Sequence, residues 1–125
     1  MNIMHNKPKH NLFKNTVYAL EGLVDITKHE TSFKWQILLF IIGVVVSWFL
    51  PIDAGYKFIL AISLIIPVIA EVINSAIERV VDLVTHDYHI LAKQAKDAGA
   101  AIVFLSLITL AAIWIATLLI AFKVV

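Results

Sequence analysis

Three long apolar segments dominate this sequence, over about residues 33–52, 57–84 and 98–122. Each has roughly 20 residues or more, enough for a helix to cross a hydrocarbon core about 30 Å thick. Of the 125 residues, 61% are hydrophobic and 15% are charged, and a soluble domain of this size cannot bury so much apolar surface. The sequence therefore predicts an all-α integral membrane protein, with three transmembrane helices in one membrane domain over residues 1–125.

An amphipathic helix is predicted before the first span, over about residues 10–29. Its apolar residues recur at helical spacing, while Lys14, Glu21 and Asp25 share the other face. Such a helix is too polar to cross a bilayer and suits the membrane surface, although packing against the bundle is an alternative. Residues 1–10 are predicted to be a basic arm. This polar stretch is too long for the n-region of a signal peptide, so we expect the first span to remain in the mature protein.

The distribution of basic residues predicts the orientation of the chain. Lysine and arginine are concentrated before the first span and in the segment after the second, whereas the other side holds Lys57 and Lys123. By the positive-inside rule, the N terminus and residues 78–97 are expected to be cytoplasmic. A formal net charge of +1 argues against a nucleic-acid partner,. The absence of cysteine excludes thiolate chemistry,.

Acidic residues form a stripe along the second predicted span. At about 100° per residue, Glu71, Glu78 and Asp82 point to one side of a helix within roughly 20°. Asn74 lies about 60° to one side. Charged groups are costly at membrane depth, so these residues should face a bundle interior or a functional site. Counted from Phe58 at 1.5 Å per residue, Glu71 is submerged about 20 Å along the helix and Glu78 reaches the headgroup level at about 30 Å.

Several side chains near the cytoplasmic edge suit phosphate and metal binding. Glu30 precedes the first span at the level of Glu78, and carboxylates together with phosphate oxygens are the ligands that Mg²⁺ prefers. Lys96 and Asp97 begin the third span, where a lysine and a helix N-terminus favour phosphate. Glu71 lies deeper and is placed to accept a proton from a group that arrives through lipid. Pro67, one turn before it, is expected to kink the helix.

The residues alone leave other roles open. Glu71 fits a structural partner for a hydroxyl on another helix, or the coupling residue of a small proton-coupled transporter. A non-catalytic assembly subunit would need none of the stripe, and Lys96 with Asp97 also fits a solvated helix start. Three spans cannot surround an intramembrane carboxylate on every side, so we expect a closed homo-oligomer.

Two motifs in this sequence resemble the small bacterial integral-membrane diacylglycerol kinases, which are related to undecaprenol kinases. They read Glu71-x-x-Asn74-Ser75-Ala76-Ile77-Glu78-x-Val80-Val81-Asp82, then Tyr88-His89-x-Leu91 with Ala95-Lys96-Asp97-x-Gly99. The resemblance implies an ATP-dependent lipid kinase of phospholipid metabolism, which transfers the γ-phosphoryl group of MgATP to diacylglycerol and forms phosphatidic acid. It also implies a homotrimer of three-span subunits, each with an N-terminal surface helix, in the bacterial inner (cytoplasmic) membrane.

The resemblance also implies roles for the matching positions. Glu71 resembles the general base that activates the lipid hydroxyl, and Glu30 and Glu78 resemble the carboxylates that bind Mg²⁺. The implied ATP contacts are Tyr18, Glu30, Asn74, Glu78, Asp87, Tyr88, His89, Lys96 and Asp97. The implied lipid contacts are Glu71, Ala100 and Trp114.

Five positions depart from the family pattern and bear on the ATP contacts and the lipid preference. Asn11 and Gln94 stand where arginine is usual, Trp35 and Gln36 where a Gln-Glu pair is common, and Ala100 where serine is common. The carboxylates of the stripe, Lys96 and Asp97 match the pattern. Phosphorylation of undecaprenol and proton-coupled transport are the alternative functions.

Overall fold

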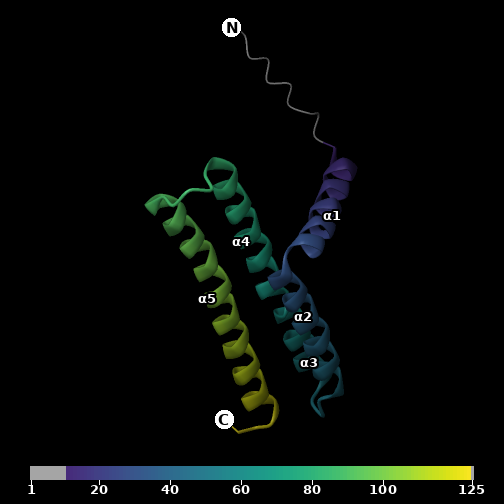
Figure 1. The fold of residues 1–125 in the computed structure, drawn as a ribbon. Coiled ribbons are helices and arrows are strands. Elements are labelled where there is room, and N and C mark those ends of the chain that lie inside the picture. Colours follow the sequence, from purple (N-terminus) through teal and green to yellow (C-terminus); the bar gives the residue numbers. More distant parts are fainter. Residues whose placement is uncertain (1–10, 125) are drawn as a thin grey trace.

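The computed structural model describes residues 11–124 as five helices (Figure 1). They are α1 (Leu12–His29), α2 (Thr31–Phe49), α3 (Ala54–Ser63), α4 (Ile65–Val84) and α5 (Ile90–Ala121). The predicted basic arm, residues 1–10, lies outside this range. Three stretches, Thr31–Phe49, Ala54–Val84 and Ile90–Ala121, are long and apolar enough to cross a membrane. The prediction of an all-helical chain with three membrane helices is confirmed.

Asn11 caps the N-terminus of α1. Its side-chain oxygen accepts hydrogen bonds from the backbone N–H groups of Phe13 (3.0 Å) and Lys14 (3.4 Å). A helix start leaves such N–H groups without intrahelical partners, and asparagine is among the residues that best supply one. Asn11 therefore has a structural role here, at a position where the family pattern has arginine. The apolar side chains of α1 are largely exposed, as Leu12 at 78% shows, and the placement of α1 on a membrane surface stays a prediction.

Helix α4 is the central element of the fold. It runs beside α5 over most of its length and also contacts α2 (Figure 1). Small residues allow close approach: Gly43 of α2 is buried against Leu64, and Gly99 of α5 is buried against Asn74 of α4. Close packing of this kind is how helices associate in a membrane, where burial of apolar surface supplies little driving force.

The second span is interrupted at Leu64, between α3 and α4. Pro67 explains the interruption, because it has no N–H to donate to the Ser63 carbonyl one turn earlier and its ring crowds that carbonyl. The Leu64 N–H instead bonds to the Ala61 carbonyl at 3.3 Å, as in a tighter 3₁₀ turn,. The sequence predicts a distortion at Pro67, and the structure places the irregular residue about one turn before it.

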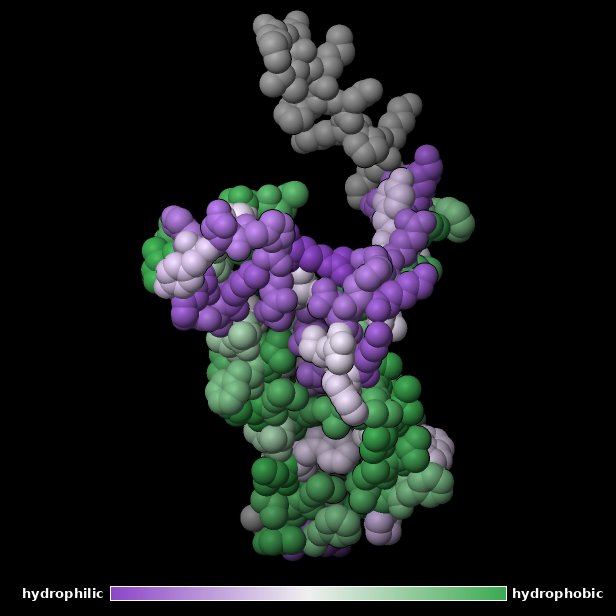
Figure 2. Space-filling model, in the orientation of Figure 1, coloured by the Kyte–Doolittle hydropathy of each residue, from purple (hydrophilic) through white to green (hydrophobic). Residues whose placement is uncertain are grey.

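Helix α5 begins at Ile90, well before residue 98, where the third span was expected to start. The Nδ1 atom of His89 accepts a hydrogen bond from the Leu91 N–H at 3.2 Å and so caps the helix. The polar residues around Lys93 therefore belong to the first turns of a helix, ahead of the predicted start of the third span. The polar side chains of α1 and of the α4–α5 connection gather at one end of the molecule, above a broad apolar band (Figure 2).

Candidate functional site

Two hydrogen bonds from consecutive residues of α4 hold the predicted metal-binding carboxylates. Asn74 Nδ2 donates to Glu78 Oε1 at 3.0 Å, and Ser75 Oγ donates to Glu30 Oε1 at 3.0 Å. Glu30 is the single residue between α1 and α2, with extended backbone (φ −105°, ψ 113°), so the chain bends there beside α4. The structure thus brings Glu30 and Glu78, which are distant in sequence, to neighbouring positions along one helix.

Asn74 also carries a buried oxygen without a partner. Its Oδ1 atom accepts no hydrogen bond from residues 11–124, and the whole residue is only 9% exposed. Gly99 leaves just enough room for this oxygen, because a Cβ at position 99 would clash with it. Leaving such an atom unsatisfied costs about 1–3 kcal/mol, so a ligand that contacts it gains affinity.

The oxygen atoms of these three side chains are of the type that suits a hard cation. The Asn74 Oδ1 atom and the carboxylates of Glu30 and Glu78 are all oxygen ligands, the type that Mg²⁺ prefers. Within residues 11–124, histidine and acidic side chains form no group of three or more that could hold a metal ion by themselves. Mg²⁺ commonly takes one or two protein carboxylates and completes its shell with substrate phosphates and water. The residues present therefore fit Mg²⁺ bound together with a phosphate ligand.

Glu71 lies one turn deeper on α4 than Asn74 and is buried, at 5% exposure. Its carboxylate takes part in none of the ion pairs among residues 11–124. Burying a carboxyl group without a cationic partner costs folding free energy, and a purely structural role does not account for that cost. Its position between the apolar band and the carboxylate pair suits a group that accepts a proton from a lipid hydroxyl.

Arg79 and Asp25 belong to this network, and their contacts were not expected from the sequence. The Arg79 guanidinium contacts Asp25 Oδ2 at 2.5 Å through Nη1 and Glu30 Oε1 at 3.4 Å through Nη2. Arg79 follows Ser75 by four residues, and residues at this spacing share one helix face. The four-residue spacing of Ser75 and Arg79 was the one signal in the sequence for these contacts, because one helix face presents both side chains to Glu30.

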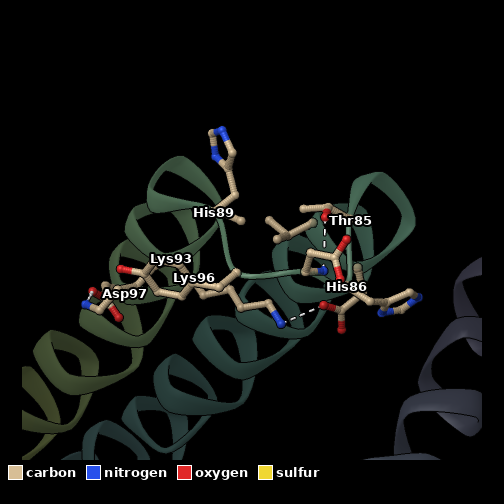
Figure 3. Close-up of a pocket in the computed structure, with 11 residues that line it drawn as sticks. Thr85, His86, His89, Lys93, Lys96 and Asp97 are labelled. Atoms are coloured by element: carbon tan, nitrogen blue, oxygen red, sulfur yellow. Dashed lines mark hydrogen bonds and ion pairs between the residues drawn. The ribbon is translucent and has the colours of Figure 1, made fainter.

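A cavity of about 700 Å³ opens between the end of α4 and the start of α5 (Figure 3). Five of the predicted ATP contacts line it, namely Asp87, Tyr88, His89, Lys96 and Asp97. Other side chains in its wall were not predicted, namely Val81, Asp82, Thr85, His86, Ala92 and Lys93. The remaining predicted ATP contacts do not line this cavity: Glu30, Asn74 and Glu78 form the carboxylate network, and Tyr18 is exposed on α1.

Ion pairs order the charged side chains of this cavity. Lys96 Nζ contacts Asp82 Oδ1 at 2.6 Å, the interaction drawn as a dashed line from Lys96 in Figure 3. Lys93 Nζ contacts Asp97 Oδ2 at 2.5 Å along α5. Asp82, the member of the stripe without an assigned role, therefore orients Lys96 from the facing helix.

The predicted lipid contacts are spread along the bundle. Trp114 lines an apolar cavity of about 330 Å³ between α2 and α5, and its buried Nε1 has no hydrogen-bond partner within residues 11–124. Glu71 and Ala100 do not line this cavity. For Ala100 the reason is its distance along α5, because the 14 residues from Ala100 to Trp114 span about 21 Å.

The Asp25–Arg79 pair predicts a titration that can be measured directly. The hydrogen bond from Arg79 lowers the pKa of Asp25, burial opposes the shift, and the charge of Arg79 and contacts with His29 add to it. Because the pKa is depressed on folding, the stabilisation is complete above the ordinary value of about 3.9 and is lost as the pH falls through the lowered value. In a ¹³C-carboxyl NMR titration, Arg79→Ala should raise the midpoint of Asp25 toward the ordinary value. The exposed Glu21 is the internal control, and an unmoved Asp25 midpoint would contradict the pairing.

Comparison with known proteins gives the same family that the two motifs suggested. Residues 17–118 match the family described as prokaryotic diacylglycerol kinase. A Haemophilus influenzae protein named diacylglycerol kinase is 38% identical over 104 residues, which cover 82% of this chain and 87% of that protein. Proteins of the same name from Escherichia coli K12 and Pseudomonas aeruginosa are each 33% identical, covering 82% and 83% of this chain and 84% and 85% of their own lengths.

These matches cover most of both chains and include both motifs. With the three apolar helices, they support a multi-pass bacterial membrane protein. The chain belongs to the prokaryotic diacylglycerol kinase family.

Proposed function

We propose that this protein transfers the γ-phosphoryl group of MgATP to the free hydroxyl of diacylglycerol, forming phosphatidic acid in phospholipid metabolism. The observation that carries the proposal is the order of groups along α4. Glu71 is buried within the apolar part of the bundle, and the hydrogen-bonded pairs of Asn74 with Glu78 and of Ser75 with Glu30 lie toward its polar end. A lipid hydroxyl approaches from the apolar side and a nucleotide from the polar side.

The proposed reaction is a direct phosphoryl transfer in which Glu71 is the general base. The hydroxyl oxygen of diacylglycerol forms a bond to the γ-phosphorus, and the bond from this phosphorus to the β–γ bridging oxygen breaks. ADP leaves, and the Glu71 carboxylate takes the hydroxyl proton. Phosphoryl transfer depends mainly on positioning and on neutralising charge, so one proton acceptor and a cation site are sufficient chemistry.

Glu30, Glu78 and the free oxygen of Asn74 would hold Mg²⁺, which neutralises charge on the transferring phosphates. Ser75 orients Glu30 and Asn74 orients Glu78 through the two 3.0 Å hydrogen bonds. Each carboxylate keeps a second oxygen for a cation. The remaining acceptors are the phosphate oxygens of ATP.

The cavity between α4 and α5 is proposed to bind the rest of ATP. Lys96, oriented by Asp82, supplies a positive charge toward the phosphates,. Asp87, Tyr88 and His89 form the wall at the connection between the helices. The hydroxyl, imidazole and carboxylate groups of these residues suit the ribose and base of ATP. Because Lys96 is proposed to contact the phosphates, this binding mode needs no glycine-rich phosphate loop.

The complete enzyme is proposed to be a homotrimer in the bacterial inner membrane, with the N terminus in the cytoplasm. Tyr18 and Ala100 are exposed in a single chain, and Trp114 lines an apolar cavity that does not include Glu71. Contacts of these residues with one pair of substrates are therefore best met by more than one subunit. The concentration of lysine and arginine before α2 and near the α4–α5 connection supports the orientation,.

A labelled-phosphate assay tests this function. Purified protein in mixed micelles is incubated with γ-labelled ATP, Mg²⁺ and either diacylglycerol or undecaprenol. We expect label in phosphatidic acid, dependent on Mg²⁺, and little in undecaprenyl phosphate. Label in neither lipid would contradict the kinase, and a preference for undecaprenol would replace the proposed substrate.

A further inference from the structure

The network around Glu30 holds one positive charge between two negative charges. Arg79 lies between Asp25 of α1 and Glu30, and it contacts them unequally. Its Nη1 lies 2.5 Å from Asp25 Oδ2, whereas its Nη2 lies 3.4 Å from Glu30 Oε1. The short contact engages the guanidinium mainly with Asp25, and Glu30 receives its closer hydrogen bond from Ser75 at 3.0 Å.

This inequality matters for the proposed role of Glu30. A guanidinium bound fully to a carboxylate occupies both oxygens and cancels the charge that would attract a cation. A guanidinium held at the edge of the carboxylate restrains its direction and leaves one oxygen free. In the structure the contacts of Ser75 and Arg79 with Glu30 are both made to Oε1, so Oε2 receives no hydrogen bond from residues 11–124.

We propose that Arg79 and Asp25 form a charge-balanced clamp on Glu30: Arg79 positions the carboxylate, and Asp25 keeps Arg79 from neutralising it. The proposal rests on the proposed function, in which Glu30 is a ligand of Mg²⁺. Arg79 is a positioning residue, because it acts through Glu30. Since Asp25 belongs to α1 and Arg79 to α4, the clamp also joins the N-terminal helix to the helix that carries Glu71.

The clamp predicts different effects on divalent-cation affinity from two variants that break the same ion pair. In Asp25→Asn, Arg79 turns fully to Glu30, and divalent-cation affinity should fall about three- to fivefold, a modest change because the charges are partly exposed. In Asp25→Asn/Arg79→Ala, the competing charge is gone, and the affinity should return to within about twofold of wild type. If the Asp25–Arg79 pair only joined α1 to α4, the divalent-cation affinity of the double variant would be no higher than that of Asp25→Asn.

Arg79→Ala alone separates positioning from charge. Within the described residues 11–124, the Glu30 carboxylate then keeps only its hydrogen bond from Ser75. We therefore expect a lower kcat with a half-saturating metal concentration that is unchanged or lower. Arg79→Lys restores the charge but, with one nitrogen, reaches only one of the two carboxylates. It should recover part of the kcat of wild type.

The test uses the full chain in mixed micelles and two readouts. One is Mn²⁺ binding followed by electron paramagnetic resonance with a non-hydrolysable ATP analogue, and the other is kcat and the Mg²⁺ concentration for half-maximal rate. The matched control is Lys28→Gln, which removes a positive charge two positions before Glu30 from a side chain in none of the ion pairs among residues 11–124. This control should leave both readouts unchanged.

The outcomes separate the clamp from the proposed function. Weaker Mn²⁺ binding in Asp25→Asn, restored in the double variant, supports the clamp. Equal binding in Asp25→Asn and the double variant, with normal wild-type kinase activity, overturns the clamp alone. A wild-type protein that neither binds Mn²⁺ nor phosphorylates lipid overturns the proposed function, and the clamp with it.

Discussion

Replacing Glu71 by glutamine is expected to lower turnover by about 10²- to 10⁴-fold, the usual contribution of a general base. Glutamine has nearly the same size and still forms hydrogen bonds, but it cannot take the proton of the lipid hydroxyl. Glu71 is buried at 5% exposure and takes part in none of the ion pairs among residues 11–124, so its neutral replacement should not disturb packing. Assembly of the proposed trimer and the proposed binding of MgATP are expected to persist.

The experiment compares kcat, nucleotide binding and oligomeric state of Glu71→Gln with those of wild type. Glu21→Gln is the matched control, because it makes the same change on the exposed face of α1, outside the ion pairs among residues 11–124. Loss of assembly together with activity would mean that Glu71 is a structural partner for another helix. Proton-driven transport by a protein without kinase activity would favour the transporter hypothesis.

Gly99→Ala is expected to lower activity by about 10- to 100-fold without unfolding the protein. The added Cβ would clash with Asn74 Oδ1, and the asparagine side chain is free to turn away. It would then lose the hydrogen bond to Glu78 and withdraw its free oxygen from the proposed cation site. A hydrogen bond to a charged group contributes roughly 1.5–3 kcal/mol, and about 1.4 kcal/mol corresponds to a tenfold change in rate.

Gly22 provides the matched control for this change. It lies within α1, and a Cβ added there would meet nothing within 4 Å. Gly22→Ala should leave kcat unchanged and stabilise α1 slightly, since alanine is the better helix former. Helix content from circular dichroism and kcat are measured for both variants. Full activity in Gly99→Ala would show that the position of Asn74 is not needed.

The membrane helices could be predicted because their signal is local. Long runs of apolar residues are visible in the sequence, and any such run must form a helix in order to satisfy its backbone in lipid. Local detail was less predictable. The irregular residue lies at Leu64 because the missing N–H of Pro67 acts on the preceding turn,. Helix α5 starts at Ile90 because His89 caps it, and histidine is a weak signal for a cap,.

The candidate site divides in the same way. The pairing of Asn74 with Glu78 follows from their spacing of four residues on one helix, and the stripe from Glu71 to Asp82 follows from the same periodicity,. The contacts of Glu30 with Ser75 and Arg79, and of Lys96 with Asp82, join residues of different helices. No local pattern encodes such contacts, although the four-residue spacing of Ser75 and Arg79 was a partial signal.

The sequence by itself determined that the chain crosses a membrane as helices and that its acidic residues share one face of the second span, because hydropathy and helical periodicity are properties of neighbouring residues. The tertiary structure alone decided that Glu30 lies beside α4 and that Asp25 competes with Glu30 for Arg79. It also decided that Gly99 leaves room for the free oxygen of Asn74. The physical reason is that these arrangements depend on how closely separate helices approach, and small residues and charges far apart in the chain set that approach together.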